Sequence, residues 1–445
     1  MPRLEIINTP IAERRCEVFV IGCGPAGSTI STMLAQKGRD VAVADKDRHP
    51  RFHIGESLLP QNMPILQELG VWEELKRIGI RKEAADFESH AHGKTVSFEF
   101  SQAFDKRWPH AFQVRRSEFD DMLLRNAADK GARVYEGVRV TAVEFGNLER
   151  NEDTIVTLKS EDDSTQTWRT RFLIDASGRD TFLSDRFGIK QKNKKHTSAA
   201  IFGHFRNARR NAGSAEGNIT IVWFAHGWFW FIPLKDGTTS VGAVCWPAYM
   251  KSRSTDPTTF LMQTIALAPE IAGRLKDAEL MAPVTATGNY SYYSSRMSGP
   301  GYLMVGDAWA FIDPIFSSGV LLAMNSAKLG AGVVDAVLND PASAPALYRQ
   351  FDRTVRRGLN TFTWLIYRMT SPVIRKLFMT PRNVFGVQSA VVSLLAGDVF
   401  RDGPVRPRLY LFRLIYYFNC LADLPTAFRA WRKRRRDIQA SGEST

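Results

Sequence analysis

Short apolar runs alternate with amphipathic segments along the first part of the chain, which is the pattern of alternating strands and helices. Glu17–Ile21 predicts a buried strand, Ser28–Lys37 a helix and Val41–Ala44 a second strand. Two later runs, Phe172–Ile174 and Tyr302–Val305, predict further strands. We therefore expect an α/β fold.

A glycine-rich turn joins the first predicted strand to the first helix. Gly22, Gly24 and Gly27 would give a tight turn, a close approach of backbone N–H groups to a pyrophosphate, and close packing of helix on sheet. Asp45 follows the second strand and can accept hydrogen bonds from a ribose. This is a dinucleotide-binding fingerprint, with Ala26 and Lys46 as neighbouring candidates, and the acid favours FAD or NAD.

Three later signals distinguish between these cofactors. Arg116 opens an amphipathic helix and could reach a phosphate, while Asp175 and the pair Gly306-Asp307 follow predicted strands. Each could also be a plain turn or helix cap. In this order they resemble the FAD fold of p-hydroxybenzoate-hydroxylase-like flavoproteins, which implies a Rossmann-like FAD-binding domain interleaved with a β-sheet substrate domain.

Three further motifs carry a more specific resemblance. In the predicted strand Gly227–Pro233, Trp228 and Trp230 share one face with Ile232. An aromatic core strand would have the same pattern, but the string also matches the WxWxIP signature of flavin-dependent halogenases. His53–Pro60 and Phe311–Val320 resemble segments of the same family, and this implies flavin contacts at Gly55, Glu56, Ser57, Pro314, Gly319 and Val320.

The resemblance covers about residues 16–400. Within the family, the sequence is most similar to the branch that acts on phenols or on pyrroles and aromatics held by a carrier protein. It implies that FADH2, O2 and a chloride or bromide ion yield hypohalous acid. Backbone N–H groups at Ser318 and Gly319 would hold the halide, although a plain helix N-cap fits the same turn. Trp228 and Trp230 would shield the flavin.

The family also places a lysine at the far end of the path of the oxidant, and Lys82 lies at the matching position. Chemically this must be an amine in a pocket of low dielectric constant, where its pKa falls. Lys76 is the competitor, but it lies among charged residues on a probable solvated helix face.

One departure from the family pattern narrows the expected substrate. Tryptophan halogenases carry a glutamate where this chain has Phe316, so an electron-rich phenol or pyrrole is favoured over free tryptophan. Two rivals remain on the same fold: a flavin-dependent aromatic monooxygenase and a geranylgeranyl-reductase-like flavoprotein. Neither requires the WxWxIP string together with Lys82.

Charge is concentrated at the C-terminal end. The chain has a net charge of +13, and residues 341–445 hold 18 basic and 6 acidic residues. Helices are expected over Tyr348–Met369, Val387–Leu395, Leu409–Leu421 and Phe428–Arg436. This basic helical region favours an acidic carrier protein or peripheral contact with an anionic membrane, or it is a solvated tail.

No nucleic-acid recognition fold accompanies the basic charge, so nucleic acid is not an expected partner. The halogenase resemblance implies that a separate reductase supplies the reduced flavin. No second glycine fingerprint is found, as is also the case in single-component hydroxylases of this fold. The four cysteines are widely spaced, no metal site is expected, and no signal or membrane-spanning segment is evident. A cytoplasmic location is therefore expected.

The motif order predicts three units. Residues 1–185 and 286–337 form the FAD-binding domain, 186–285 the β-sheet substrate domain, and 338–445 the basic helical C-terminal region.

Overall fold

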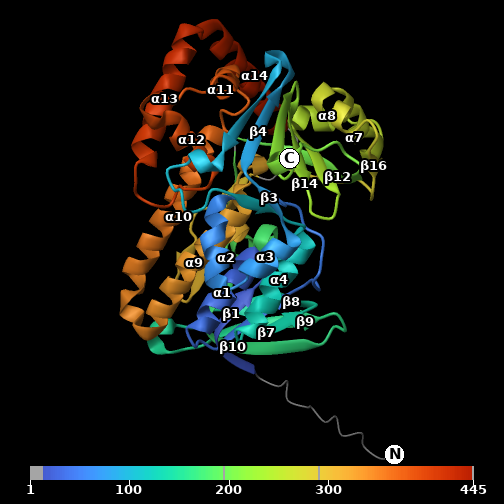
Figure 1. Cartoon of the computed structure of the whole chain (residues 1–445). Coiled ribbons are helices and arrows are strands. Elements are labelled where there is room, and N and C mark those ends of the chain that lie inside the picture. The colour runs from blue at the N-terminus through green and yellow to red at the C-terminus, as the bar shows by residue number, and fades with distance from the viewer. Residues whose placement is uncertain (1–13, 194–195, 289–290, 443–445) are drawn as a thin grey trace, which may run out of the picture.

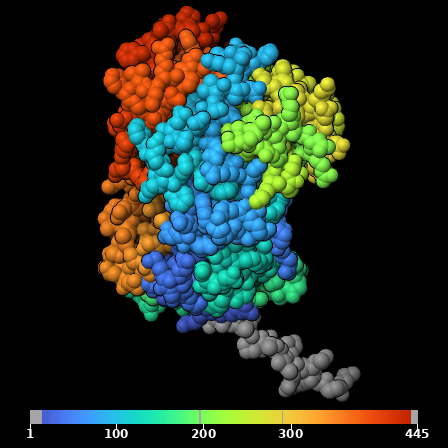
Figure 2. Space-filling model, in the orientation of Figure 1, coloured from blue at the N-terminus to red at the C-terminus, as the bar shows by residue number. Residues whose placement is uncertain are grey.

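The computed structural model describes residues 14–193, 196–288 and 291–442. Its lower half in Figure 1 is an α/β unit, a second sheet with its own helices lies above it, and the C-terminal helices run along one side. Figure 2 shows these C-terminal helices as a continuous flank of the molecule. The expected fold class is confirmed.

The sheet of the lower unit has a parallel centre. Its main order is β19-β20-β10-β1-β2-β7, with β9 paired antiparallel to β10 and β8 paired antiparallel to β9. The strands are β1 (Arg14–Ile21), β2 (Val41–Asp45), β7 (Arg133–Glu136), β8 (Val138–Glu144), β9 (Thr154–Ser160), β10 (Thr165–Asp175), β19 (Ser298–Gly299) and β20 (Tyr302–Met304). Because β20 joins β10 from far along the chain, this unit is interleaved with the next.

Three helices lie against the parallel strands: α1 (Pro25–Gln36), α4 (Arg116–Asp129) and α9 (Ser318–Asn339). Among the described residues, α9 is the helix whose length and hydropathy would let it cross a membrane. It packs on α1 and α10 and buries Leu321, Met324 and Val334 completely or nearly so. We therefore interpret it as a core helix.

The second sheet has the order β16-β12-β15-β14-β13-β4-β5, with β17 paired to β12. Its strands are β4 (Ala84–Ser89), β5 (Lys94–Glu99), β12 (Ala199–Arg206), β13 (Ile219–Phe224), β14 (Gly227–Pro233), β15 (Thr239–Cys245), β16 (Glu279–Leu280) and β17 (Thr285–Thr287). The expected boundaries place residues 84–99 in the FAD-binding unit, whereas their strands β4 and β5 extend this second sheet.

The two faces of this sheet follow the twofold alternation of its strands. Trp228, Trp230 and Ile232 belong to the main core, whereas Phe229 and Phe231 pack with α7 (Pro257–Ala266) and α8 (Pro269–Arg274) in a separate cluster. The predicted common face of the two tryptophans is thus confirmed, and it is turned toward the FAD-binding unit.

The remaining elements connect and cover these two sheets. They are α2 (Met63–Leu69), α3 (Trp72–Ile78), α5 (Phe182–Arg186), α6 (Pro247–Lys251), α10 (Ala344–Ile366), α11 (Pro372–Met379), α12 (Val387–Leu395), α13 (Val405–Ala422), α14 (Leu424–Gly442), the pair β3 (Ile80–Lys82) with β6 (Ala111–Gln113), and the small sheet β11 (Lys190–Lys192), β18 (Tyr292–Ser294) and β21 (Ala310–Phe311). All four expected C-terminal helices are present: α12 has the expected bounds, and the ends of α10, α13 and α14 are shifted.

Gly242 on β15 makes room for the tryptophan face. It pairs with Trp230, and a Cβ at this position would lie 2.3 Å from the Trp230 ring and 2.5 Å from Cβ of Phe202. We expect Gly242→Ala to lower the free energy of unfolding by about 1–3 kcal/mol through overpacking. Urea denaturation measures this loss.

Gly332→Ala is the matched control for this substitution. Gly332 lies on an exposed face of α9 with nothing within 4 Å of an added Cβ, so alanine should leave stability unchanged or raise it by up to ~1 kcal/mol. Equal effects of the two substitutions would contradict the packing argument.

Candidate functional site

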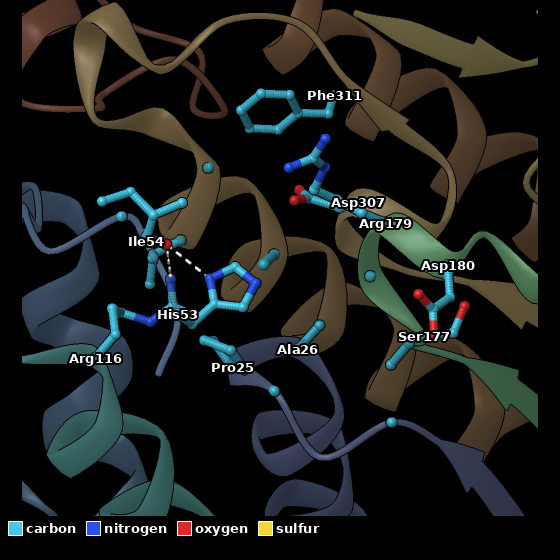
Figure 3. Close-up of a pocket in the computed structure, with 18 of the residues that line it drawn as sticks. Pro25, Ala26, His53, Ile54, Arg116, Ser177, Arg179, Asp180, Asp307 and Phe311 are labelled. Carbon is cyan, nitrogen blue, oxygen red and sulfur yellow. Dashed lines mark hydrogen bonds between the residues drawn. The ribbon is translucent and has the colours of Figure 1, made fainter. Parts of the chain in front are cut away.

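A cavity of about 550 Å³ opens between the carboxyl ends of the first sheet and the tryptophan face of the second. In Figure 3, Pro25 and Ala26 lie at the start of α1, with His53, Ile54 and Arg116 to one side and Ser177, Arg179 and Asp180 to the other. Predicted residues that line it are Gly22, Gly24, Ala26, Asp45, Lys46, Gly55, Glu56, Ser57, Arg116, Trp228, Trp230, Asp307, Pro314, Gly319 and Val320. Most of the predicted site residues therefore line one cavity.

The glycine turn has the geometry that its spacing predicts. Gly22 has φ +96°, and a Cβ on Gly27 would lie 1.8 Å from the Gly22 carbonyl oxygen, so Gly27 serves close packing and not cavity lining. Gly24 faces open space, because a Cβ there would meet only Nη2 of Arg51, at 3.8 Å. The N-terminus of α1 is thus open to a diphosphate.

Asp45 lines the cavity, but its carboxylate already holds the backbone. Its Oδ2 accepts the Cys23 N–H at 2.6 Å and its Oδ1 accepts the Asp47 N–H at 3.0 Å. The side chain therefore stiffens the glycine turn and retains lone pairs for a ribose.

Cationic groups surround the cavity from several elements. Arg116 donates from Nε and Nη2 to the buried Asp120 and from Nη1 to the Ile54 carbonyl, while Arg51 lies 3.5 Å from the same Asp120. Lys46 pairs with Asp180 across the cavity mouth at 2.5 Å. These groups fit an anionic cofactor, since one buried carboxylate serves two arginines.

Two predicted acids take different positions. Asp307 lines the cavity, and burial raises its pKa to about 6. Asp175 is fully buried outside the lining, where its oxygens accept the N–H groups of Ser177 and Leu183 at 2.9 and 2.7 Å. It therefore positions the loop that carries Ser177–Asp180, and Gly306 likewise lies behind the lining, with φ +61°.

The segment from His53 to Ser57 crosses the cavity wall. Gly55 has φ +108°, and burial lowers the pKa of His53 to about 4. Glu56 is buried, with Oε1 2.8 Å from Nε2 of His204 on β12, whereas its Oε2 has no hydrogen-bond partner among the described residues. A polar oxygen is thus left for a ligand in the cavity.

Lys82 lies directly behind this segment. Its side chain is 1% exposed, and Nζ donates to Oγ of Ser57 at 2.9 Å and to the Leu58 carbonyl at 3.0 Å. Burial lowers the pKa of Lys82 to about 7. Ser57 lines the cavity and Lys82 does not, so the amine is one hydrogen bond away from it and points away from solvent.

The two tryptophans form part of the opposite wall. Trp228 and Trp230 have ring centroids 6.1 Å apart and are 4% and 5% exposed. Nε1 of Trp230 donates to Oγ of Ser240 at 3.1 Å, which fixes the ring. This part of the wall is aromatic and almost fully buried.

The predicted halide turn comes directly before α9. Oδ1 of Asp313 accepts the Ile315 N–H at 3.0 Å and caps the short turn Pro314–Phe316, Ser317 has φ +54°, and α9 starts at Ser318. Ser317 and Gly319 line the cavity, whereas the Ser318 side chain is buried beside it. Ser317 is the N-cap residue but its side chain makes no capping hydrogen bond, so the first N–H groups of α9 are left for other acceptors.

Sequence reasoning did not identify several cavity residues. Arg51 and Phe52 line the cavity directly before the His53–Pro60 motif. Arg179 and Val138–Val140 also line it, but they belong to no sequence motif and reach the cavity only through the fold. Trp309, between the cavity residues Asp307 and Phe311, does not line the cavity, and its Nε1 donates to the Ser294 carbonyl.

Comparison with known proteins places the fold and cavity in context. Residues 15–351 match the family model for the FAD binding domain. The chain is 31% identical over 414 residues to the 1H-pyrrole-2-carbonyl-(peptidyl-carrier protein) chlorinase of Pseudomonas fluorescens, across 86% of this chain and 89% of that protein. The chain belongs to the flavin-dependent halogenase family.

Two further members of this halogenase family support the same conclusion. The chain is 35% identical over 343 residues to a tryptophan 2-halogenase of Chondromyces crocatus, across 75% of this chain but only 64% of that protein's length. The structure of the myxobacterial chondrochloren halogenase is 30% identical with a TM-score of 0.76 over 90% of each chain. FAD is thus the cofactor that the halogenase cavity is built to hold.

The buried amine predicts how halogenase stability depends on pH. Folding lowers the Lys82 pKa from 10.5 to about 7, so between these values the unfolded chain binds more protons and stability rises with pH. The cost of burying a charged amine is therefore greatest below pH 7. We expect Lys82→Met to raise the free energy of unfolding more at pH 6 than at pH 9, by roughly 2–3 kcal/mol.

Urea denaturation at the two pH values measures this difference. Lys76→Met is the control, because the Lys76 side chain is 45% exposed and pairs with Glu73 on the surface. If both variants show the same dependence on pH, Lys82 is not buried as described.

Proposed function

We propose that this protein is an FADH2- and O2-dependent halogenase that chlorinates or brominates an electron-rich aromatic or heteroaromatic ring. The observation that carries the proposal is the buried Lys82 amine, 2.9 Å from Ser57 on the wall of the FAD cavity. A monooxygenase or a geranylgeranyl-reductase-like enzyme has no use for a dry amine at this place.

The overall chemistry balances in two steps. Reduced FAD, when bound, would supply two electrons and two protons, with which O2, a halide ion and one further proton give hypohalous acid and water. The ring then exchanges a proton for the halogen, and a second water is released. A pKa of about 7 leaves a large fraction of Lys82 neutral at neutral pH, so its lone pair can accept the proton or the halogen of the oxidant.

The remaining residues are assigned by position. Backbone N–H groups at Ser318 and Gly319 would hold the halide at the start of α9, where the helix dipole favours an anion. Trp228 and Trp230 would keep the ring substrate away from the flavin. Ser57 would pass the oxidant to Lys82, since it contacts both the cavity and the amine.

Substrate and partners follow from relatives and charge. The Pseudomonas fluorescens relative acts on a pyrrole held by a peptidyl carrier protein, which supports a phenol- or pyrrole-type ring with an acidic carrier as one source. The name of the Chondromyces crocatus relative places tryptophan on the test panel as well. A separate reductase would supply FADH2, and free cysteines support a cytoplasmic location.

Product analysis tests this function. Purified protein with reduced FAD, O2 and bromide should give products with the bromine isotope doublet from phenols, carrier-bound pyrroles or tryptophan. Lys82→Met should lower the yield of brominated product at least 100-fold. O2-dependent oxidation of the flavin should continue, because the oxidant is still made.

Lys76→Met is the matched control and should keep full product yield. Oxygenated products that form without halide, at the same rate in Lys82→Met, would assign the protein to the monooxygenases instead.

We further propose that α13 and α14 contact an anionic membrane. Large apolar side chains recur on one side of both helices with exposures of 46–69%, namely Tyr410, Leu414, Tyr417, Phe418, Leu421, Leu424, Phe428 and Trp431. Exposed cations flank them, among them Arg429, Arg432 and Lys433. Apolar bodies with cationic rims suit a lipid interface.

Vesicle sedimentation tests this contact. The protein should bind vesicles that contain phosphatidylserine and not those of phosphatidylcholine alone. Replacement of Phe418, Leu421 and Trp431 by serine should weaken binding at least tenfold. Serine at Met262 and Met281, which are 46% and 41% exposed elsewhere, is the control. Unchanged binding of the triple variant would refute the contact.

A further inference from the structure

A second cavity of about 550 Å³ lies apart from the FAD cavity, and we call it the α11 cavity. Its walls are the segment after β4, the end of β13, residues 267–270 before and in α8, helix α11, and the region where α13 meets α14. It therefore lies where the second sheet meets the C-terminal helices.

A pair of tryptophans on neighbouring strands separates the two cavities. Trp223 on β13 pairs directly with Trp228 on β14, so both side chains stand on one face of the sheet. Trp228 lines the FAD cavity and Trp223 lines the α11 cavity. Phe87 stacks on Trp223 with ring centroids 5.4 Å apart.

The α11 cavity has two hydrogen-bond donors without acceptors. Trp223 is 6% exposed, and its Nε1 has no hydrogen-bond partner among the described residues. The buried Nε of Arg375 also lacks one, and the guanidinium lies 5.7 Å from the Trp223 ring centroid. Among the described residues, Arg375 makes no ion pair.

The Arg375 guanidinium loses hydration in the α11 cavity, and this changes its pKa. Burial lowers the pKa of Arg375 to about 10, and no carboxylate opposes this shift. Arg375 is partly exposed with a buried Nε, so its guanidinium loses part of its hydration without a counter-ion, and an anion that entered the cavity would offset this cost. Two donors on adjacent side chains suit an oxyanion.

Another wall supplies an acceptor. Oε1 of Glu270 is buried without a hydrogen-bond partner among the described residues, and it lies 3.9 Å from Nδ1 of His90. Asp423 also lines the cavity, but it is exposed to solvent, and its Oδ1 accepts the Thr426 N–H at 3.4 Å. Phe224, Leu267 and Val373 supply apolar surface between these polar groups.

We infer that the α11 cavity binds a molecule that carries an oxyanion and an N–H donor on an apolar body. Arg375 and the indole N–H of Trp223 take the oxyanion, and Glu270 accepts the N–H. Two sources have this chemistry: the phosphate and amides of a pantetheine arm, and the carboxylate and ammonium of an aromatic amino acid. Binding at this site does not depend on the halogenase activity.

Isothermal titration of the FAD-loaded protein with pantetheine 4′-phosphate and, separately, with L-tryptophan tests the site. We expect one equivalent of at least one probe to bind, with affinity at least tenfold lower in Arg375→Gln. Trp223→Phe keeps the ring and removes the donor, and it should weaken binding about fivefold. The better probe identifies the source.

Arg382→Gln is the matched control, because Arg382 is an exposed arginine beyond the end of α11 and away from the cavity. Flavin absorbance and thermal unfolding establish that each variant is folded, and Arg375→Gln should be no less stable than the parent, because it removes an unpaired cation. Failure of both probes to bind at millimolar concentration would overturn the inference, as would equal affinity in Arg375→Gln and Arg382→Gln.

Discussion

The hydrogen bond from Lys82 to Ser57 is the constraint on which the site depends. It joins the short β3–β6 pair, which carries Lys82, to the segment that crosses the wall of the FAD cavity. The amine has left water with only a hydroxyl, a carbonyl and the Phe100 ring, 5.2 Å away, in place of its hydration shell. Burial lowers the pKa of this amine more than the nearby Asp86 carboxylate raises it, so Lys82 holds its proton weakly.

The second sheet gives this amine its surroundings. Because side chains alternate along β13 and β14, one face receives the tryptophans and the other receives the phenylalanines that pack under α7 and α8. The first face extends from the FAD cavity to the α11 cavity, and Trp223 and Trp228 divide it. A single pleated surface thereby forms the walls of two cavities, and Gly242 provides the space that the Trp230 ring occupies.

The sequence predicted the parts of the site that local patterns encode. The glycine turn, the strand of Trp228 and Trp230, and the start of α9 all depend on residues within a few positions of one another. The pairing of Glu56 with His204 could not be read, since these residues are far apart and meet only when β12 enters the second sheet. The same holds for β4 and β5, because no short pattern states which sheet a strand joins.

Asp175 shows a different limit of sequence reasoning. A strand followed by an acid and a glycine is equally typical of an acid that binds a ligand and of an acid that holds a backbone turn. The position of the side chain in the structure distinguishes the two. Here the carboxylate accepts hydrogen bonds from two backbone N–H groups and does not line the cavity. It affects the cavity only by positioning the loop after β10.

The basic residues of the C-terminal region fall into two groups, those that pack on aromatic rings and those that are exposed, and a count of charges does not distinguish them. Arg368 lies over the rings of Trp364, Tyr416 and Tyr417, and Arg413 over Trp364 and Tyr410, so these cations hold α10 against α13. Burial lowers the pKa of Arg434 to about 10 beside Tyr367. Part of the net charge of +12 carried by residues 341–445 therefore stabilises the fold, and only the exposed cations are available to an anionic partner.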